Sequence, residues 1–131
     1  MRRIIATLAL MVLVLSAAGC GDADSDDSDV IHGTWVTELE GKYQTFNEDG
    51  SWTAKSNPDV PASTDEGTFT FDGETLTVIS DPGFGCVSEE ASQGSYDVEV
   101  ADENTLDLTV INDACEPRAA DLTSGMTRYA P

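Results

Sequence analysis

Residues 68–78 read Thr-Phe-Thr-Phe-Asp-Gly-Glu-Thr-Leu-Thr-Val, and the fold prediction starts from this stretch. Apolar and polar residues alternate on both sides of Asp72-Gly73, which is the period of two expected for a β-strand with one buried face. An Asp-Gly pair tolerates the positive φ angles that a tight hairpin turn requires. The stretch therefore predicts two antiparallel strands joined by a short turn.

The same alternation continues on both sides of this hairpin, with turn residues between the apolar runs. It predicts eight strands, at residues 33–39, 42–48, 51–56, 66–72, 74–80, 93–101, 104–112 and 124–130. Consecutive antiparallel strands leave exposed edges unless the sheet closes on itself. The predicted fold is therefore all-β, a small antiparallel up-and-down β-barrel of about eight strands.

Two longer connections interrupt the predicted strands. Residues 56–65 contain Pro58 and Pro61 and are expected to form an irregular loop. Residues 113–122 contain Pro117 and an Ala-Ala pair, and we expect a short helical turn there, before the last strand.

The N-terminal end is typical of an export signal. Arg2 and Arg3 precede an apolar run from Ile4 to Leu15, the charged n-region and the h-region of a signal peptide. As a helix this run spans about 18 Å against a hydrocarbon core of ~30 Å, too short to cross a bilayer. It ends in Leu-Ser-Ala-Ala-Gly-Cys, residues 15–20, which resembles the bacterial lipobox.

The lipobox resemblance implies that residues 1–19 are a lipoprotein-type signal peptide and that Cys20 is the lipidation site. An ordinary signal peptide, with Cys20 incidental, is the alternative. After Cys20, residues 21–29 carry five aspartates and no apolar side chain larger than alanine. We therefore expect residues 20–30 to be the lipidated cysteine and an acidic, disordered tether, and residues 31–131 to be the barrel domain.

The predicted mature chain is strongly acidic. It keeps all 25 acidic residues and four of the six basic ones, a formal charge of −21. Such a charge repels nucleic acid and anionic lipid headgroups, so we expect no nucleic-acid partner and membrane contact only through lipid on Cys20. The expected location is the cell membrane or envelope, facing outside the cytoplasm, and the protein is expected to be a monomer.

Three cysteines are an odd number for an exported protein. Lipidation of Cys20 accounts for one, and Cys86 and Cys115 are then expected to form a disulfide in an oxidising compartment. Closing that loop would stabilise the fold by about 3.5 kcal/mol. The competing thiol metal site is disfavoured because the single histidine, His32, has no zinc-site spacing to the cysteines, so no metal is expected.

Gly33-Thr34-Trp35 is similar to the G-x-W start of the lipocalin and calycin barrels, and residues 43–52 are similar to a hairpin of small bacterial lipocalin-like domains. This resemblance covers roughly residues 31–130. It implies a barrel floor in which Arg128 stacks over Trp35, next to Gly33. The chain lacks the Thr-Asp-Tyr motif and the long C-terminal helix of full lipocalins, so a capacious ligand cup is not implied.

Catalytic machinery is not expected. The single histidine lies at the start of the first strand, and no G-x-S-x-G, H-E-x-x-H or phosphate-binding glycine loop occurs. Adjacent carboxylates such as Glu89-Glu90 are expected by chance in so acidic a chain. We therefore predict neither an enzyme nor a cofactor.

The leading functional hypothesis is a lipid-anchored module that binds a small apolar or amphipathic ligand. The alternatives are a protein-binding module, such as an inhibitor of an exported protease, and a structural envelope lipoprotein. Strand parity predicts a mostly packed interior and at most a shallow ligand mouth near Trp52, the loop 56–65 and Phe84. The predicted interior residues are Trp35, Leu39, Phe46, Trp52, Phe69, Phe71, Leu76, Val78, Tyr96, Val98, Val100, Leu106, Leu108, Val110 and Met126.

Overall fold

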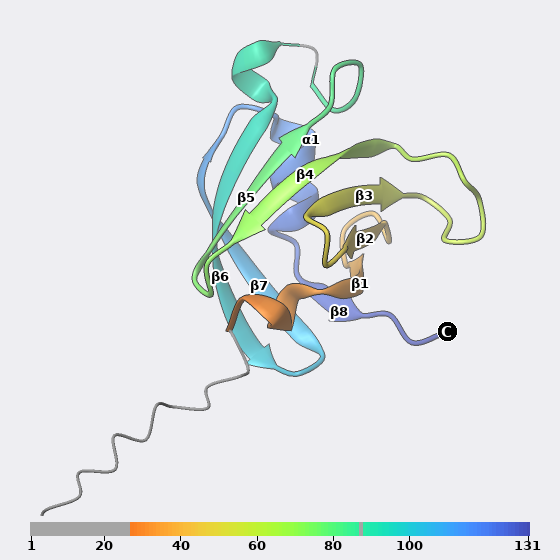
Figure 1. Cartoon of the computed structure of the whole chain (residues 1–131), viewed down its shortest axis with the longest axis vertical. Coiled ribbons are helices and arrows are strands. Elements are labelled where there is room, and N and C mark those ends of the chain that lie inside the picture. The colour runs from red at the N-terminus through yellow and green to blue at the C-terminus, as the bar shows by residue number, and fades with distance from the viewer. Residues whose placement is uncertain (1–26, 87) are drawn as a thin grey trace, which may run out of the picture.

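The structure, a computed structural model, describes residues 27–86 and 88–131. Eight antiparallel strands form a closed barrel in the order β1 to β8, which confirms the predicted fold class (Figure 1). The strands are β1 Gly33–Thr37, β2 Tyr43–Phe46, β3 Ser51–Lys55, β4 Asp65–Phe71, β5 Thr75–Ser80, β6 Gln93–Asp102, β7 Thr105–Asp113 and β8 Met126–Arg128. One short α-helix, α1 Glu116–Leu122, precedes the last strand as expected, and a 3-10 turn, η2 Glu89–Ala91, precedes β6.

Closure of the barrel depends on the last strand. β8 pairs with β1 through Trp35 and Arg128, and with β7 through Leu106 and Met126. The short helix α1 precedes β8 and contacts β7. The predicted strand at 124–130 was too long, since the hydroxyl of Ser124 is used at the end of α1, where it donates to the Asp121 carbonyl.

The predicted signal peptide and Cys20 lie outside the described residues, as does most of the predicted tether. Its last part is described, and it is helical. Residues 27–31 form a 3-10 helix, η1 Asp27–Ile31. The physical reason is Ile31, whose side chain is fully buried and whose carbonyl accepts a hydrogen bond of 2.8 Å from Trp35 Nε1.

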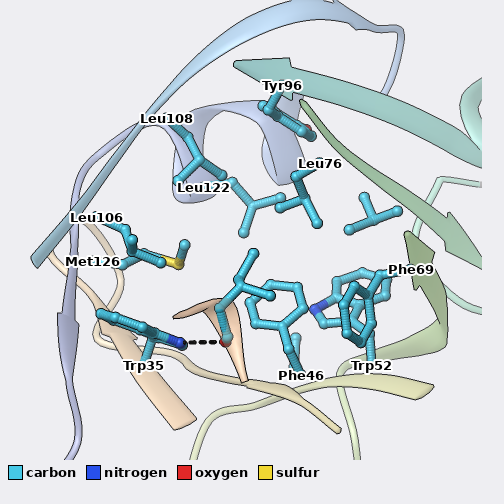
Figure 2. Close-up of a cluster of buried hydrophobic side chains, with 13 residues drawn as sticks. Trp35, Phe46, Trp52, Phe69, Leu76, Tyr96, Leu106, Leu108, Leu122 and Met126 are labelled. Carbon is cyan, nitrogen blue, oxygen red and sulfur yellow. Dashed lines mark hydrogen bonds between the residues drawn. The ribbon is translucent and has the colours of Figure 1, made fainter. Parts of the chain in front are cut away.

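Buried side chains from around the barrel form one cluster inside it (Figure 2). Ten of the predicted interior residues are buried, and Phe71 and Val98 are half-buried against them. Ile31, Ala54 and Leu122 join the core without having been predicted. The buried members of the predicted set are Trp35, Phe46, Trp52, Phe69, Leu76, Val78, Tyr96, Leu106, Leu108 and Met126.

Three predicted interior residues are exposed instead. Leu39 is 61% exposed because β1 ends at Thr37 and the chain turns there, with the Gly41 amide bonded to the Thr37 carbonyl. Val100 and Val110 are 41% and 44% exposed, and both lie next to register shifts in the β6–β7 pairing. A bulge turns neighbouring side chains out of the regular alternation, which sequence parity alone does not reveal.

The two ends of the barrel are covered differently. η1 lies where β1 begins, and α1 lies where β1 ends, as Figure 1 shows. Ile31 fills the first end, whereas Leu122 and Ala119 of α1 pack on the core at the second. In the described part of the chain, no helix is long and apolar enough to cross a membrane.

Candidate functional site

The barrel floor at the η1 end is built around Trp35. The guanidinium of Arg128 lies over the indole, 4.1 Å from its centroid, and donates hydrogen bonds to the carbonyls of Val30, His32 and Glu103. A Cβ at Gly33 would come within 2.8 Å of Arg128 Nη1, so glycine leaves the space that the guanidinium occupies. This end is therefore a packed and hydrogen-bonded closure, with Arg128 lying on Trp35.

The predicted disulfide is confirmed. Cys86 and Cys115 are bonded, with their Cα atoms 5.5 Å apart. The bond ties the loop after β5 to Cys115, the residue that directly precedes α1. It holds these two segments together at the end of the barrel opposite the floor.

Beside the disulfide lies a cavity of about 190 Å³, which we call the mouth pocket. Its walls come from β2, β3, the start of β4, the disulfide and α1. The residues that line it are Lys42, Gln44, Trp52, Ala54, Thr64, Asp65, Gly85, Cys86, Cys115, Pro117, Arg118 and Asp121.

One wall of the mouth pocket is a chain of buried hydrogen bonds. Asp121 Oδ1 accepts from Thr37 Oγ1 at 2.6 Å, and Asp121 Oδ2 accepts from Gln44 Nε2 at 3.0 Å. Gln44 Oε1 in turn accepts from Trp52 Nε1 at 2.9 Å. Burial raises the pKa of the Asp121 carboxyl, and these hydrogen bonds only partly oppose that effect. This series of hydrogen bonds fixes the orientation of the Asp121 carboxylate and of the Trp52 indole, which both line the pocket.

Asp65 forms another part of the wall, and only one of its two carboxylate oxygens has a partner. Oδ2 accepts from Ser80 Oγ at 3.0 Å, whereas Oδ1 is buried and has no hydrogen-bond partner among the described residues. Burial raises the pKa of this carboxyl, against the lowering effects of Ser80 and of the Arg118 charge. A buried acceptor without a donor costs about 1–3 kcal/mol, so Asp65 is a position where folding stability is lost.

Arg118 lies at the back of the mouth pocket and is fully engaged. Its five N–H groups donate to both oxygens of Asp113, to Ser80 Oγ and to the carbonyls of Ala91 and Ser92. The Tyr96 hydroxyl donates to Asp113 as well, and its pKa is raised, chiefly by burial. This cluster joins β5, β6, β7 and α1, which makes it a structural support behind the pocket.

The structure separates the two residues predicted at the ligand mouth. Trp52 lines the mouth pocket, but Phe84 does not. Phe84 lines a neighbouring surface hollow of about 540 Å³, between the end of β5 and η2. Gly85 and Cys86 lie between the two, because the loop after β5 has one side facing each.

Sequence reasoning missed the polar residues of the mouth pocket. A signal for them was present, since Gln44 has the same strand parity as Phe46, and Asp65 the same parity as Phe69. A polar residue at an inward position of a barrel strand is either a buried hydrogen-bonding group or part of a site. Asp121 and Arg118 had no such signal, because the connection that carries them has no strand period.

A scan against protein-family models, a search of curated proteins and a search of solved structures found no match to this chain. The lipocalin-like resemblance therefore stays a resemblance of short motifs, and function has to be argued from the site itself. Among residues 27–86 and 88–131, no three His, Cys, Asp or Glu side chains are grouped as a metal site.

Proposed function

We propose that this protein is a lipid-anchored, extracytoplasmic binding module that holds a small ligand in the mouth pocket. The observation that carries the proposal is the combination of an indole, a disulfide and oriented, buried polar groups around one cavity of about 190 Å³. Binding sites combine apolar walls with a few placed polar groups in this way. The anchoring part of the proposal is supported by the signal-peptide pattern and the lipobox resemblance at Cys20.

The size and lining of the mouth pocket restrict the ligand class. An apolar cavity of about 150 Å³ holds a molecule the size of benzene, so this one suits a ligand of roughly six to eight heavy atoms. Because Gln44, Asp65 and Asp121 line it beside Trp52, a polar or amphipathic ligand fits better than a purely apolar one. The packed axis below the pocket supports the same size limit.

The test is native mass spectrometry of the exported Cys20→Ser protein, examined for a retained small molecule. A Thr64→Trp variant places an indole at the rim of the pocket, and we expect it to lose the bound molecule. The matched control is Thr70→Trp, on the exposed face of β4 away from the pocket. Retention of the molecule by both variants would show that it binds elsewhere.

A protein-binding module, such as an inhibitor of an exported protease, is the second candidate. The observation that favours it is the packed barrel axis, which leaves no capacious interior for a ligand. A protein bound to the exported chain in one-to-one amount, with no small molecule retained, would favour this candidate over the first.

A further inference from the structure

The charges around the mouth pocket do not cancel. Arg118 is neutralised by Asp113, with Nη2 2.7 Å from Oδ1, and all of its donors are used. An anionic ligand would therefore have to break an existing bond to reach this guanidinium. The guanidinium of Arg118 therefore has no free donor to offer a ligand.

Lys42, the other cation of the pocket, is also paired. Its Nζ lies 2.5 Å from Glu40 Oε2, on a partly exposed side chain. Among the described residues, Asp65 and Asp121 form no ion pair within 4 Å. Two carboxylates thus line the mouth pocket without a paired cation.

The hydrogen bonds of Asp65 indicate which kind of group a ligand would supply to the mouth pocket. Asp65 Oδ2 accepts from Ser80 Oγ, and Ser80 Oγ accepts from Arg118 Nη1 at 2.8 Å, so neither of these donors is free for Oδ1. Oδ1 is left as an acceptor with no donor, on a residue that is only 8% exposed and lines the pocket. The group that completes this site is a hydrogen-bond donor, and a positive charge would also balance the carboxylates.

We propose that the mouth pocket binds a compact organic cation of the alkylammonium class. Its positive end faces the carboxylates of Asp65 and Asp121, and its apolar part packs on Trp52, Ala54 and the disulfide. An organic cation fits better than a metal ion, since no group of three ligating side chains is present in the described part of the chain. This inference rests on the proposed function, because it names the ligand class of the same pocket.

The probes are pentylammonium, pentan-1-ol and pentanoate, which have the same chain and differ in charge. Isothermal titration calorimetry on the exported Cys20→Ser protein is expected to show saturable one-to-one binding of pentylammonium, at least tenfold tighter than pentan-1-ol. Pentanoate is expected not to bind. Asp65→Asn and Asp121→Asn should each weaken pentylammonium at least tenfold.

The matched control is Asp107→Asn, an exposed residue of β7 outside the pocket. Asp107→Asn removes the same charge from the protein. An equal loss of pentylammonium affinity in this variant would show that the overall negative charge, and not the pocket, attracts the cation. That result would overturn the proposal. Near-ultraviolet circular dichroism checks that each variant is folded. Because burial already penalises the Asp65 carboxylate, we expect Asp65→Asn to fold at least as well as the parent protein. Asp121→Asn replaces one of two accepting oxygens with a donor, so we expect it to be folded but less stable.

The outcomes separate this inference from the proposed function. Binding of pentan-1-ol or pentanoate in preference to pentylammonium, abolished by Thr64→Trp, would overturn the cation class and keep the small-ligand function. Tight binding of Ca²⁺ alone, lost in Asp65→Asn, would replace the organic cation with a metal ion. Failure of all three organic probes, with no molecule retained in native mass spectra, would overturn both proposals.

Discussion

Gly33 lies against the guanidinium of Arg128, and both its backbone conformation and that contact favour glycine. The φ angle of Gly33 is +117°, and an added Cβ would lie 2.8 Å from Arg128 Nη1. Gly41 also has a positive φ, +63°, but a Cβ added there would meet no other segment within 4 Å. The pair compares a glycine that lies against Arg128 with a glycine that faces open space.

We expect Gly33→Ala to lower the free energy of unfolding by about 2–4 kcal/mol, through strain and displacement of the cation from Trp35. Gly41→Ala should cost about 1 kcal/mol, from backbone strain alone. Urea unfolding followed by tryptophan fluorescence measures both. Equal losses would show that the Arg128 contact contributes nothing to stability.

The raised pKa of Asp65 predicts a pH dependence of folding stability that is opposite to the usual one for a carboxyl group. Because burial raises its pKa in the folded state above the ordinary value of 3.8, the folded protein binds protons more readily than the unfolded chain. The associated stability is fully present below pH 3.8 and is lost as the pH rises through the raised pKa. Asp65→Asn should therefore stabilise the protein by about 1 kcal/mol at neutral pH and have little effect in acid, below the ordinary pKa.

The control for this prediction is Asp49, which has a shift of opposite sign. Hydrogen bonds from the Ser51 hydroxyl and amide lower the pKa of the Asp49 carboxyl. Its stabilisation is present above the unfolded pKa and is lost as the pH falls through the folded one. Asp49→Asn should therefore destabilise the protein at neutral pH, and thermal unfolding from about pH 3 to pH 7 compares the two variants.

At the scale of elements, the disulfide joins two segments that the strands alone do not hold. The loop after β5 and the start of α1 are tied at Cys86 and Cys115, and both cysteines line the mouth pocket. Leu122 and Asp121 of α1 then cover the core and orient Gln44. The disulfide thus supports both the mouth pocket and the end of the barrel that α1 covers.

We expect the Cys86→Ala/Cys115→Ala double variant to lose about 3.5 kcal/mol of stability, as the chain-entropy model gives for a loop of 29 residues. The mouth pocket should loosen before the floor, because η1 and Arg128 do not depend on the bond. Hydrogen exchange resolves this order: amides of α1 should exchange faster than those of β1. Uniform protection across both elements would contradict it.

At the scale of the whole molecule, the predicted localisation signal and the barrel lie in separate parts of the chain. The predicted lipidation site, Cys20, lies outside the described residues, and all eight strands of the barrel lie within residues 33–128. Cys20→Ser should therefore leave a folded barrel and move the protein from the membrane fraction to the soluble one. Two acyl chains hold a protein stably on a membrane, so the shift should be nearly complete.

Fractionation and intact mass measure this prediction. The parent protein should carry the added lipid mass, and the circular dichroism of Cys20→Ser should be that of a β-barrel. A membrane-bound Cys20→Ser protein, together with a parent protein free of lipid, would refute the anchor. An ordinary, cleaved signal peptide would then be the better explanation of residues 1–19.

Strand number, strand order and most of the core could be predicted from the sequence. Alternation around Asp72-Gly73, Trp35 and Leu106 reports which face is buried, and burial of one face is a local property of a strand. The pairing of Cys86 with Cys115 could be predicted as well, because three cysteines with one assigned to lipid leave a single pair. The strands and the core depend on residues close in sequence, and the disulfide follows from the number of cysteines.

The mouth pocket, in contrast, exists only in the folded chain. Asp121, Gln44 and Asp65 come from a helix and two strands, and they become one site because barrel closure brings β2, β4 and α1 to the same end. Folding likewise places Leu39, Val100 and Val110 toward solvent, at a turn and beside two bulges. Turns and bulges depend on hydrogen bonds between segments, so the local alternation of residues carries no record of them.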